Sequence, residues 1–236
     1  DASGNPVTGF VMQHNQQGLV NDKPVPTSIT RRAEDLRRMM SITLSMTPGE
    51  HFVGCGESFT KIDKRGQKLN MWSCDPKGVM GPEMYKPVPF YISSCGYGLF
   101  VHNTAPSTFD FGSTYDGALN VFLDDEEADL FFFLGTPREI LDDYTNLTGK
   151  SPVPPLWSFG LWMSRCSYYT QEEVLEVAEK MRQVQIPCDV IHIDTGWFET
   201  NWRCDFKFSP SRFPNAKQML DSLHDQHYHA SLWMLP

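Results

Sequence analysis

The chain has 236 residues, of which 40% are hydrophobic and 13% aromatic, so it can bury a sizeable core in one large or two modest domains. Its net charge of −9 argues against nucleic acid as a partner. No apolar stretch reaches the roughly 18 residues that a membrane span needs, and residues 1–20 lack a signal peptide's features. We therefore expect a soluble protein, cytoplasmic or periplasmic, and the sequence does not decide its compartment.

The first half of the chain reads as a series of short strands. Runs of β-branched and aromatic residues are separated by Gly, Pro, Asn and Asp, at residues 41–46, 51–56, 68–74, 88–94, 96–103, 107–112, 118–124 and 129–135. The turn "SSCGYG" at residues 93–98 joins two runs closely enough for a hairpin. This rhythm favours an antiparallel β-sandwich, and we place this domain at residues 1–135.

A helix and a Pro-rich segment follow. Thr136 can cap a helix that Pro137 opens and that continues through residues 138–147. Gly149 can end it before "SPVPPLW" at residues 151–157. We therefore expect residues 136–156 to connect two domains.

From Trp157 the pattern alternates between strands and helices. The strands are expected at residues 159–164, 188–194 and 229–235, and the helices at residues 170–184 and 216–228. In the first helix, Thr170 and Glu173 fit a capping box, and one face carries Val174, Val177, Ala178 and Met181. Such a βαβαβ chain forms a parallel sheet, either in an open doubly wound fold or in a (β/α)8 barrel. We place this domain at residues 157–236.

The carboxyl ends of these strands are where a ligand site is expected. Asp194 follows the second strand and lies near tryptophans and tyrosines, a composition suited to sugars, because rings stack on sugar faces and carboxylates accept hydroxyl protons. An Asp after a buried strand is as often a helix N-cap or turn residue, so both interpretations stay open. His192 inside the strand is expected to be an interior polar group rather than a base.

Several other chemistries lack their signatures. The chain has no GxGxxG, no phosphate-binding P-loop sequence and no GxSxG. Its six cysteines form no CxxC pair, and we expect free, mostly buried thiols. His224, His227 and His229 lie close together, but the first two fit the polar face of a helix, so we expect no metal site and no cofactor.

Three segments of the second domain resemble a known family in order and spacing. Residues 159–174 ("FGLWMSRCSYYTQEEV"), 186–215 ("IPCDVIHIDTGWFETNWRCDFKFSPSRFPN") and 229–236 ("HASLWMLP") resemble the start of the catalytic barrel of glycoside hydrolase family 31, the α-glucosidase and α-xylosidase family. Residues 50–75, with "GCGE", and residues 84–103, with "PFYIS", resemble its N-terminal β-sandwich. The resemblance implies an antiparallel β-sandwich followed by the first β/α units of an incomplete (β/α)8 barrel.

The resemblance also implies roles for individual residues. Asp194 matches an Asp that hydrogen-bonds sugar hydroxyls in the −1 subsite, so it binds rather than attacks. Trp233 matches a position that carries Trp in α-xylosidases and a smaller aliphatic residue in typical α-glucosidases. The residues expected to bind substrate are Asp194, Trp233, Arg165, Thr195, Gly196 and Trp197.

Two departures leave the sugar open. After the strand-end Asp, α-glucosidases of the family usually carry Ile and Asp, and α-xylosidases a Cys-Phe pair. Thr195 and Gly196 match neither pattern, although the bulk of Trp233 tilts the expectation toward an α-xylosidase-like member.

The implied activity is that of a retaining α-glycoside hydrolase acting on an oligosaccharide or glycoside. Such enzymes need two carboxyl groups, and the family places both on later barrel strands. We therefore expect no catalytic residue in this chain, with the nucleophile and the acid/base beyond Pro236, and no activity without the rest of the barrel. The alternatives are an α-glucosidase or a noncatalytic carbohydrate-binding protein. A homo-oligomer is left open.

Overall fold

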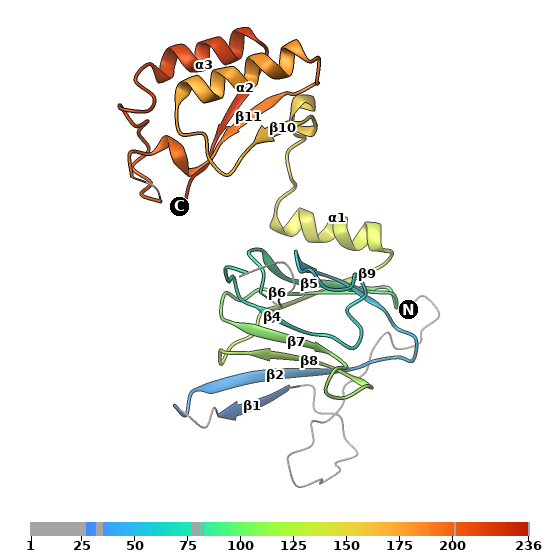
Figure 1. The fold of residues 1–236 in the computed structure, drawn as a ribbon. Helices are drawn as coiled ribbons and strands as arrows, with labels where there is room; N and C mark the ends of the chain where they lie inside the picture. The colour runs from blue at the N-terminus through green and yellow to red at the C-terminus, as the bar shows by residue number, and fades with distance from the viewer. Residues whose placement is uncertain (1–26, 32–34, 77–80, 82, 201, 236) are drawn as a thin grey trace. The chain divides into compact units, whose positions relative to one another are not determined.

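The computed structural model describes residues 27–31, 35–76, 81, 83–200 and 202–235. They belong to two compact units, which divide between Lys150 and Ser151 (Figure 1). The expectations for residues 1–20, Asn201 and Pro236 lie outside the described residues. The predicted domain boundaries at residues 135 and 156 stay predictions.

Two antiparallel sheets form the first unit (Figure 1). The first sheet has the order β1 (Thr27–Arg31), β2 (Arg38–Ser45), β8 (Ala118–Leu123), β7 (Ser107–Phe111) and β4 (Lys68–Met71). The second has the order β3 (Phe52–Gly56), β5 (Pro87–Ser93), β6 (Tyr97–Val101) and β9 (Leu130–Leu134). All eight predicted strands and the β5–β6 hairpin are confirmed, whereas β1 was not predicted. Its only large apolar side chain, Ile29, is 61% exposed, so β1 lacks a buried pattern.

The inner faces of both sheets share one aromatic core. Phe52 and Tyr91 of the four-stranded sheet meet Phe111 of the five-stranded sheet, with ring centroids 5.0 to 5.7 Å apart, and all three side chains are fully buried. The Tyr91 ring contacts both Phe rings edge to face, and such contacts add about 0.5–1.5 kcal/mol per pair to the burial of the rings. This shared core makes the unit the predicted sandwich.

Helix α1 (Pro137–Thr148) covers the outer face of the four-stranded sheet. Ile140 is fully buried against Phe90 and Ile92, and the rings of Phe90 and Tyr144 stack 4.0 Å apart. The helix begins with a complete capping box in which Thr136 and Glu139 satisfy each other's backbone amides. The predicted Pro opening is therefore confirmed, and α1 packs on the sandwich.

A glycine-flanked bulge interrupts strand β3. Cys55 adopts a positive φ of 67° between Gly54 and Gly56, and the β3–β5 register shifts there. A Cβ at Gly54 would lie 2.6 Å from the carbonyl oxygen of Phe90, so only glycine fits. All six cysteines are free, as predicted, but only Cys55 and Cys188 are buried. Burial raises the pKa of the Cys55 thiol, the nearby charge of Lys64 offsets part of this shift, and the resulting pKa is about 12.

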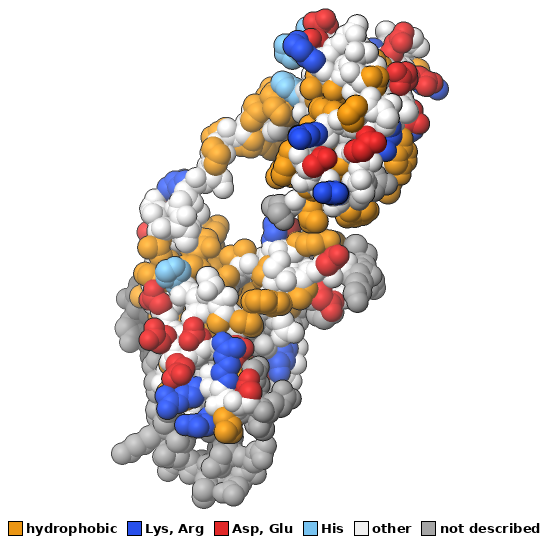
Figure 2. Space-filling model, turned by 90° about the vertical axis from the view of Figure 1, so that its left-hand side faces the viewer, with side chains coloured by type: hydrophobic (Ala, Val, Ile, Leu, Met, Phe, Trp, Pro, Cys, Tyr) orange, Lys and Arg blue, Asp and Glu red, His pale blue; other side chains and the backbone are white. Residues whose placement is uncertain are grey.

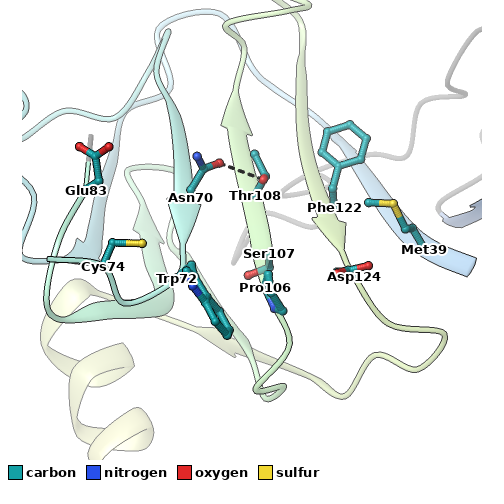
Figure 3. Close-up of a pocket in the computed structure, with 10 residues that line it drawn as sticks. All are labelled: Met39, Asn70, Trp72, Cys74, Glu83, Pro106, Ser107, Thr108, Phe122 and Asp124. Atoms are coloured by element: carbon teal, nitrogen blue, oxygen red, sulfur yellow. Dashed lines mark hydrogen bonds between the residues drawn. The ribbon is translucent and has the colours of Figure 1, made fainter. Parts of the chain in front are cut away.

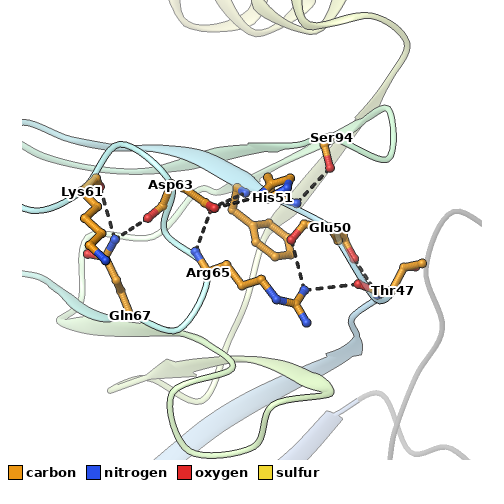
Figure 4. Close-up of polar contacts among 9 residues, drawn as sticks. Thr47, Glu50, His51, Lys61, Asp63, Arg65, Gln67 and Ser94 are labelled. Atoms are coloured by element: carbon orange, nitrogen blue, oxygen red, sulfur yellow. Dashed lines mark hydrogen bonds and ion pairs between the residues drawn. The ribbon is translucent and has the colours of Figure 1, made fainter.

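Polar side chains fasten the turn that follows β3 (Figure 4). The Asp63 carboxylate accepts hydrogen bonds from the backbone amides of Arg65 and Phe52, and it lies 2.6 Å from Nδ1 of His51. Partial burial raises the pKa of Asp63, but these hydrogen bonds outweigh it and hold the pKa below its usual value. The Arg65 guanidinium donates to the carbonyls of Thr47 and Glu50. The turn is thus held by an ionised carboxylate.

The second unit is a three-stranded parallel sheet with helices on one face (Figure 1). In chain order it contains the short 3-10 helix η1 (Leu156–Phe159), β10 (Trp162–Ser164), α2 (Gln171–Gln183), β11 (Val190–Ile193), the 3-10 turn η2 (Thr195–Trp197), α3 (Ala216–Asp225) and β12 (His229–Leu232). The predicted βαβαβ order is confirmed, but the first strand begins at Trp162 instead of residue 159, because η1 includes Phe159. No helix in the described part of the chain is long and apolar enough to cross a membrane.

The predicted capping box of α2 forms only in part. Thr170 Oγ1 accepts a hydrogen bond from the backbone amide of Glu173 at 3.2 Å, as expected. The Glu173 carboxylate, however, accepts from the amide of Tyr169 instead of that of Thr170. The predicted apolar face is confirmed, with Val174, Ala178 and Met181 buried and Val177 partly buried.

The two faces of the parallel sheet carry different side chains, because successive residues of a strand point to opposite sides. Ile191 and Ile193 pack under the helices with Val174 and Leu223. On the opposite face, strand register places Trp162, Val190 and His229 in one row and Ser164, His192 and Ser231 in the next. The second row is entirely polar.

Hydrophobic side chains also gather on the segment between α1 and β10 (Figure 2). Val153, Leu156 and Phe159 are 94%, 88% and 72% exposed. Leu156 and Phe159 belong to the single turn of η1, and Pro152, Pro154 and Pro155 keep the residues before it out of a longer helix or strand.

Candidate functional site

Asp194 directly follows strand β11 at the carboxyl edge of the parallel sheet. One carboxylate oxygen, Oδ1, accepts a hydrogen bond from the Thr195 amide at 2.7 Å and so caps the η2 turn. The other, Oδ2, lies 3.7 Å from Nε2 of His192, and 28% of the side chain is exposed. The N-cap interpretation is therefore correct, but capping uses only part of the carboxylate's hydrogen-bonding capacity.

Thr195 and Gly196 are buried against the loop that follows β10. A Cβ at Gly196 would lie 2.5 Å from the carbonyl oxygen of Tyr168 and 3.2 Å from Cβ of Ser167. Thr195 Oγ1 lies 3.3 Å from Oγ of Ser167. Both residues thus pack against the loop after β10, and the Thr195 side chain is buried.

Trp197 and Trp233 meet at the same edge in different ways. The Trp197 indole is buried, and its Nε1 donates to the carbonyl oxygen of Trp233 at 2.8 Å. The Trp233 amide donates to the carbonyl of Ile193, and its ring is half-buried at 5.2 Å and 83° from the ring of Trp202. Trp233 and the exposed Trp202 therefore form the aromatic pair near Asp194's strand, and Trp197 fixes the backbone beneath them.

Arg165 lies at the end of β10 and is exposed. Its guanidinium lies 5.1 Å from the centre of the Tyr168 ring, a cation–π contact. Burial raises the pKa of Tyr168, and Arg165 partly offsets the shift. The structure thus places all six predicted substrate-binding residues at the carboxyl edge, but only Asp194, Arg165 and Trp233 keep exposed surface there.

Arg212 holds the loop after η2, and sequence reasoning did not single it out. Its guanidinium donates to the carbonyl oxygens of Gly196 at 3.2 Å, of Glu199 at 3.4 Å and of Phe198. The available signal was a lone Arg in the Pro-rich "FSPSRFP" at residues 208–214, which does not indicate its contacts. Arg212 therefore positions the loop that follows η2.

A separate hollow of about 440 Å³ lies on the outer face of the five-stranded sheet (Figure 3). Trp72, which is 52% exposed, and Phe122 contribute rings to it. Asn70 lines it and accepts a hydrogen bond from Thr108 at 3.1 Å. It belongs to the first unit, and we assign no ligand to it.

Two family models match the chain, one in each unit. Residues 8–110 match the glycosyl hydrolase 31 N-terminal galactose mutarotase-like domain, and residues 151–236 match the glycosyl hydrolases family 31 TIM-barrel domain. The chain belongs to glycoside hydrolase family 31. Membership confirms the predicted fold class, a β-sandwich followed by the first β/α units of a barrel, and decides against the open doubly wound sheet.

The relatives that the chain matches include both an α-xylosidase and an α-glucosidase. The chain is 34% identical over 234 residues to α-xylosidase XylQ of Lactiplantibacillus pentosus, and 36% identical over 185 residues to α-glucosidase 2 of Bacillus thermoamyloliquefaciens. These matches cover 97% and 75% of this chain but only 31% and 23% of the relatives. A family 31 dextranase of Flavobacterium johnsoniae, solved with glucose, superposes with a TM-score of 0.80 at 28% identity, over 98% of this chain and 27% of that one.

Proposed function

We propose that this chain contributes the sandwich and the first barrel strands to a retaining α-glycoside hydrolase, α-xylosidase-like in its sugar preference. The observation that carries the proposal is that Asp194 and Trp233 directly follow the paired strands β11 and β12, at the carboxyl edge of a family 31 sheet. Sugar sites combine a fixed polar acceptor with an aromatic wall. The exposed Val153, Leu156 and Phe159 are compatible with cover by further protein.

Asp194 is the proposed acceptor for sugar hydroxyls in the −1 subsite. Retaining hydrolysis requires a nucleophile and an acid/base about 5 Å apart, and we propose that both lie on later barrel strands. Asp194 supports them by holding the sugar, and hydrogen bonds that tighten as the ring distorts lower the barrier. Arg165 is proposed to shape the leaving-group subsite next to it.

Trp233 is proposed to select the sugar. Its ring is braced by Trp202, and its backbone by Trp197 and Ile193, so it has little freedom to move aside. A rigid ring at this position leaves less room for the hydroxymethyl group that distinguishes glucose from xylose. We therefore expect xylosides to be preferred.

The test is a comparison of matched substrates with a protein that contains this chain and is as long as its relatives. Hydrolysis of 4-nitrophenyl α-xyloside should exceed that of the α-glucoside in kcat/KM, and Trp233→Leu should narrow the ratio by about tenfold. Asp194→Asn should lower kcat/KM for both sugars by about 10- to 100-fold, because a hydrogen bond to a charged group is lost. Asp221→Asn, on the exposed surface of α3, is the matched control.

The outcomes separate three functions. Equal kcat/KM values for both sugars, unaffected by Trp233→Leu, would remove the xylosidase assignment and leave the α-glucosidase, which the identity to an α-glucosidase also supports. Sugar binding without hydrolysis of either substrate would leave the noncatalytic carbohydrate-binding protein.

A further inference from the structure

We propose that His192 is a positioning residue that fixes the Asp194 carboxylate through its Nε2–H, while Ser231 holds the imidazole from the other side. The inference rests on the proposed role of Asp194 in sugar binding. It concerns a contact between a residue within strand β11 and the carboxylate that directly follows the strand. His192 is therefore a support for the acceptor and takes no part in the chemistry.

The geometry follows from strand register. Asp194 directly follows β11 in extended backbone and lies two residues after His192, so the two side chains lie on the same side of the sheet, with Nε2 and Oδ2 facing each other. Register pairs His192 with Ser231 of β12, and Nδ1 of the imidazole lies 3.1 Å from the Ser231 hydroxyl oxygen. Nε2, at the other side of the ring, lies 3.7 Å from Oδ2 of Asp194. The ring therefore bridges β12 and the strand-end carboxylate.

The proton positions follow from the partners. A neutral imidazole has one donor and one acceptor, and an ionised carboxylate can only accept. The proposal therefore places the proton on Nε2, facing Asp194, and has Nδ1 accept from the Ser231 hydroxyl. The separation of 3.7 Å is long for a hydrogen bond, but such contacts are often long in unliganded sites and shorten when substrate binds.

The consequence is a carboxylate with a protein donor next to each oxygen. Oδ1 receives the Thr195 amide, and Oδ2 faces the imidazole. An ionised carboxylate has about four lone-pair positions, so two protein donors leave room for sugar hydroxyls. Because its rotation is restricted before the sugar arrives, less reorganisation is needed in the transition state.

The test uses two isosteres at position 192 in the long protein that contains this chain. The amide nitrogen of Gln can occupy the place of Nε2, whereas that of Asn occupies the place of Nδ1. His192→Asn should lower kcat/KM by about tenfold, mainly through kcat, because about one hydrogen bond to a charged group is lost. His192→Gln should recover most of that loss. A merely structural role predicts equal losses for both variants, and that result would overturn the proposal.

A second measurement does not depend on activity. Side-chain 15N shifts should show His192 as the Nε2–H tautomer, and Ser231→Ala should raise the share of the Nδ1–H form. A wild-type Nδ1–H tautomer would overturn the proposal whatever the enzyme does. If the Nε2–H form is found and neither glycoside is hydrolysed, the proposed function fails while the contact between His192 and Asp194 stands.

Discussion

The sandwich and the β/α unit bury their sheets in opposite ways. In the sandwich, two sheets enclose a shared core in which Phe52, Tyr91 and Phe111 are fully buried, and α1 covers a further face. In the β/α unit, helices cover one face of the sheet, and Trp162 on the other face is 43% exposed. The face of the β/α sheet away from its helices carries the polar row of Ser164, His192 and Ser231, whereas the inner faces of the sandwich carry aromatic rings.

The largest expected difference between the two units comes from removing an aromatic ring from the core of the sandwich, which should lower the stability of that unit alone. Phe111→Ala should cost about 3–5 kcal/mol of the sandwich's free energy of unfolding, because its ring fills the centre of the core. Urea unfolding followed by circular dichroism would report this loss of stability. Tryptophan fluorescence would report the β/α unit, because that unit holds five of the six tryptophans. Phe132→Ala, at a 47% exposed side chain, is the control. An equal shift of both signals would mean that the units unfold as one.

A single methyl group should disturb the β/α unit by a smaller amount. Gly196→Ala places a Cβ against the Tyr168 carbonyl, so we expect a loss of about 1–3 kcal/mol, seen in the tryptophan signal. Gly117→Ala is the matched control, because a Cβ there has no neighbour within 4 Å. If the two variants are equally stable, the loops after β10 and β11 are not packed together as described.

The smallest effect should come from acid in the sandwich. The folded-state pKa of Asp63 is lowered, so its contribution to stability is present above the unfolded pKa of about 4 and disappears as the pH falls through the folded pKa. Asp63→Asn should therefore reduce the urea midpoint at pH 7 and weaken its decline toward pH 2. The exposed Asp143→Asn serves as the control. A parallel decline in all three proteins would show that Asp63 is not linked to folding.

The elements that the sequence predicted are those whose signal is local. Runs of β-branched and aromatic residues indicate the strands, and Thr136 followed by Pro137 indicates the start of α1. By contrast, β1 has no buried pattern, and the apolar letters around Phe159 do not distinguish a 3-10 turn from a strand.

In the site, too, only the residues with a local sequence signal could be predicted. Asp194 and Trp233 could be found because they end strands. The bridge from His192 to Ser231, 39 residues apart, and the reach of Arg212 back to Gly196, 16 residues apart, depend on register and loop path. No spacing in the sequence encodes these contacts, so they appear only in the folded chain.

The bond from Trp197 to position 233 bears on how sugar preference could evolve. Trp197 donates to the backbone carbonyl of Trp233 and not to its side chain. Every amino acid offers the same carbonyl, so the side chain at position 233 can be exchanged while the strand end stays anchored. Members of one family could thus diverge between sugars through single substitutions at this position without rebuilding the edge that holds Asp194.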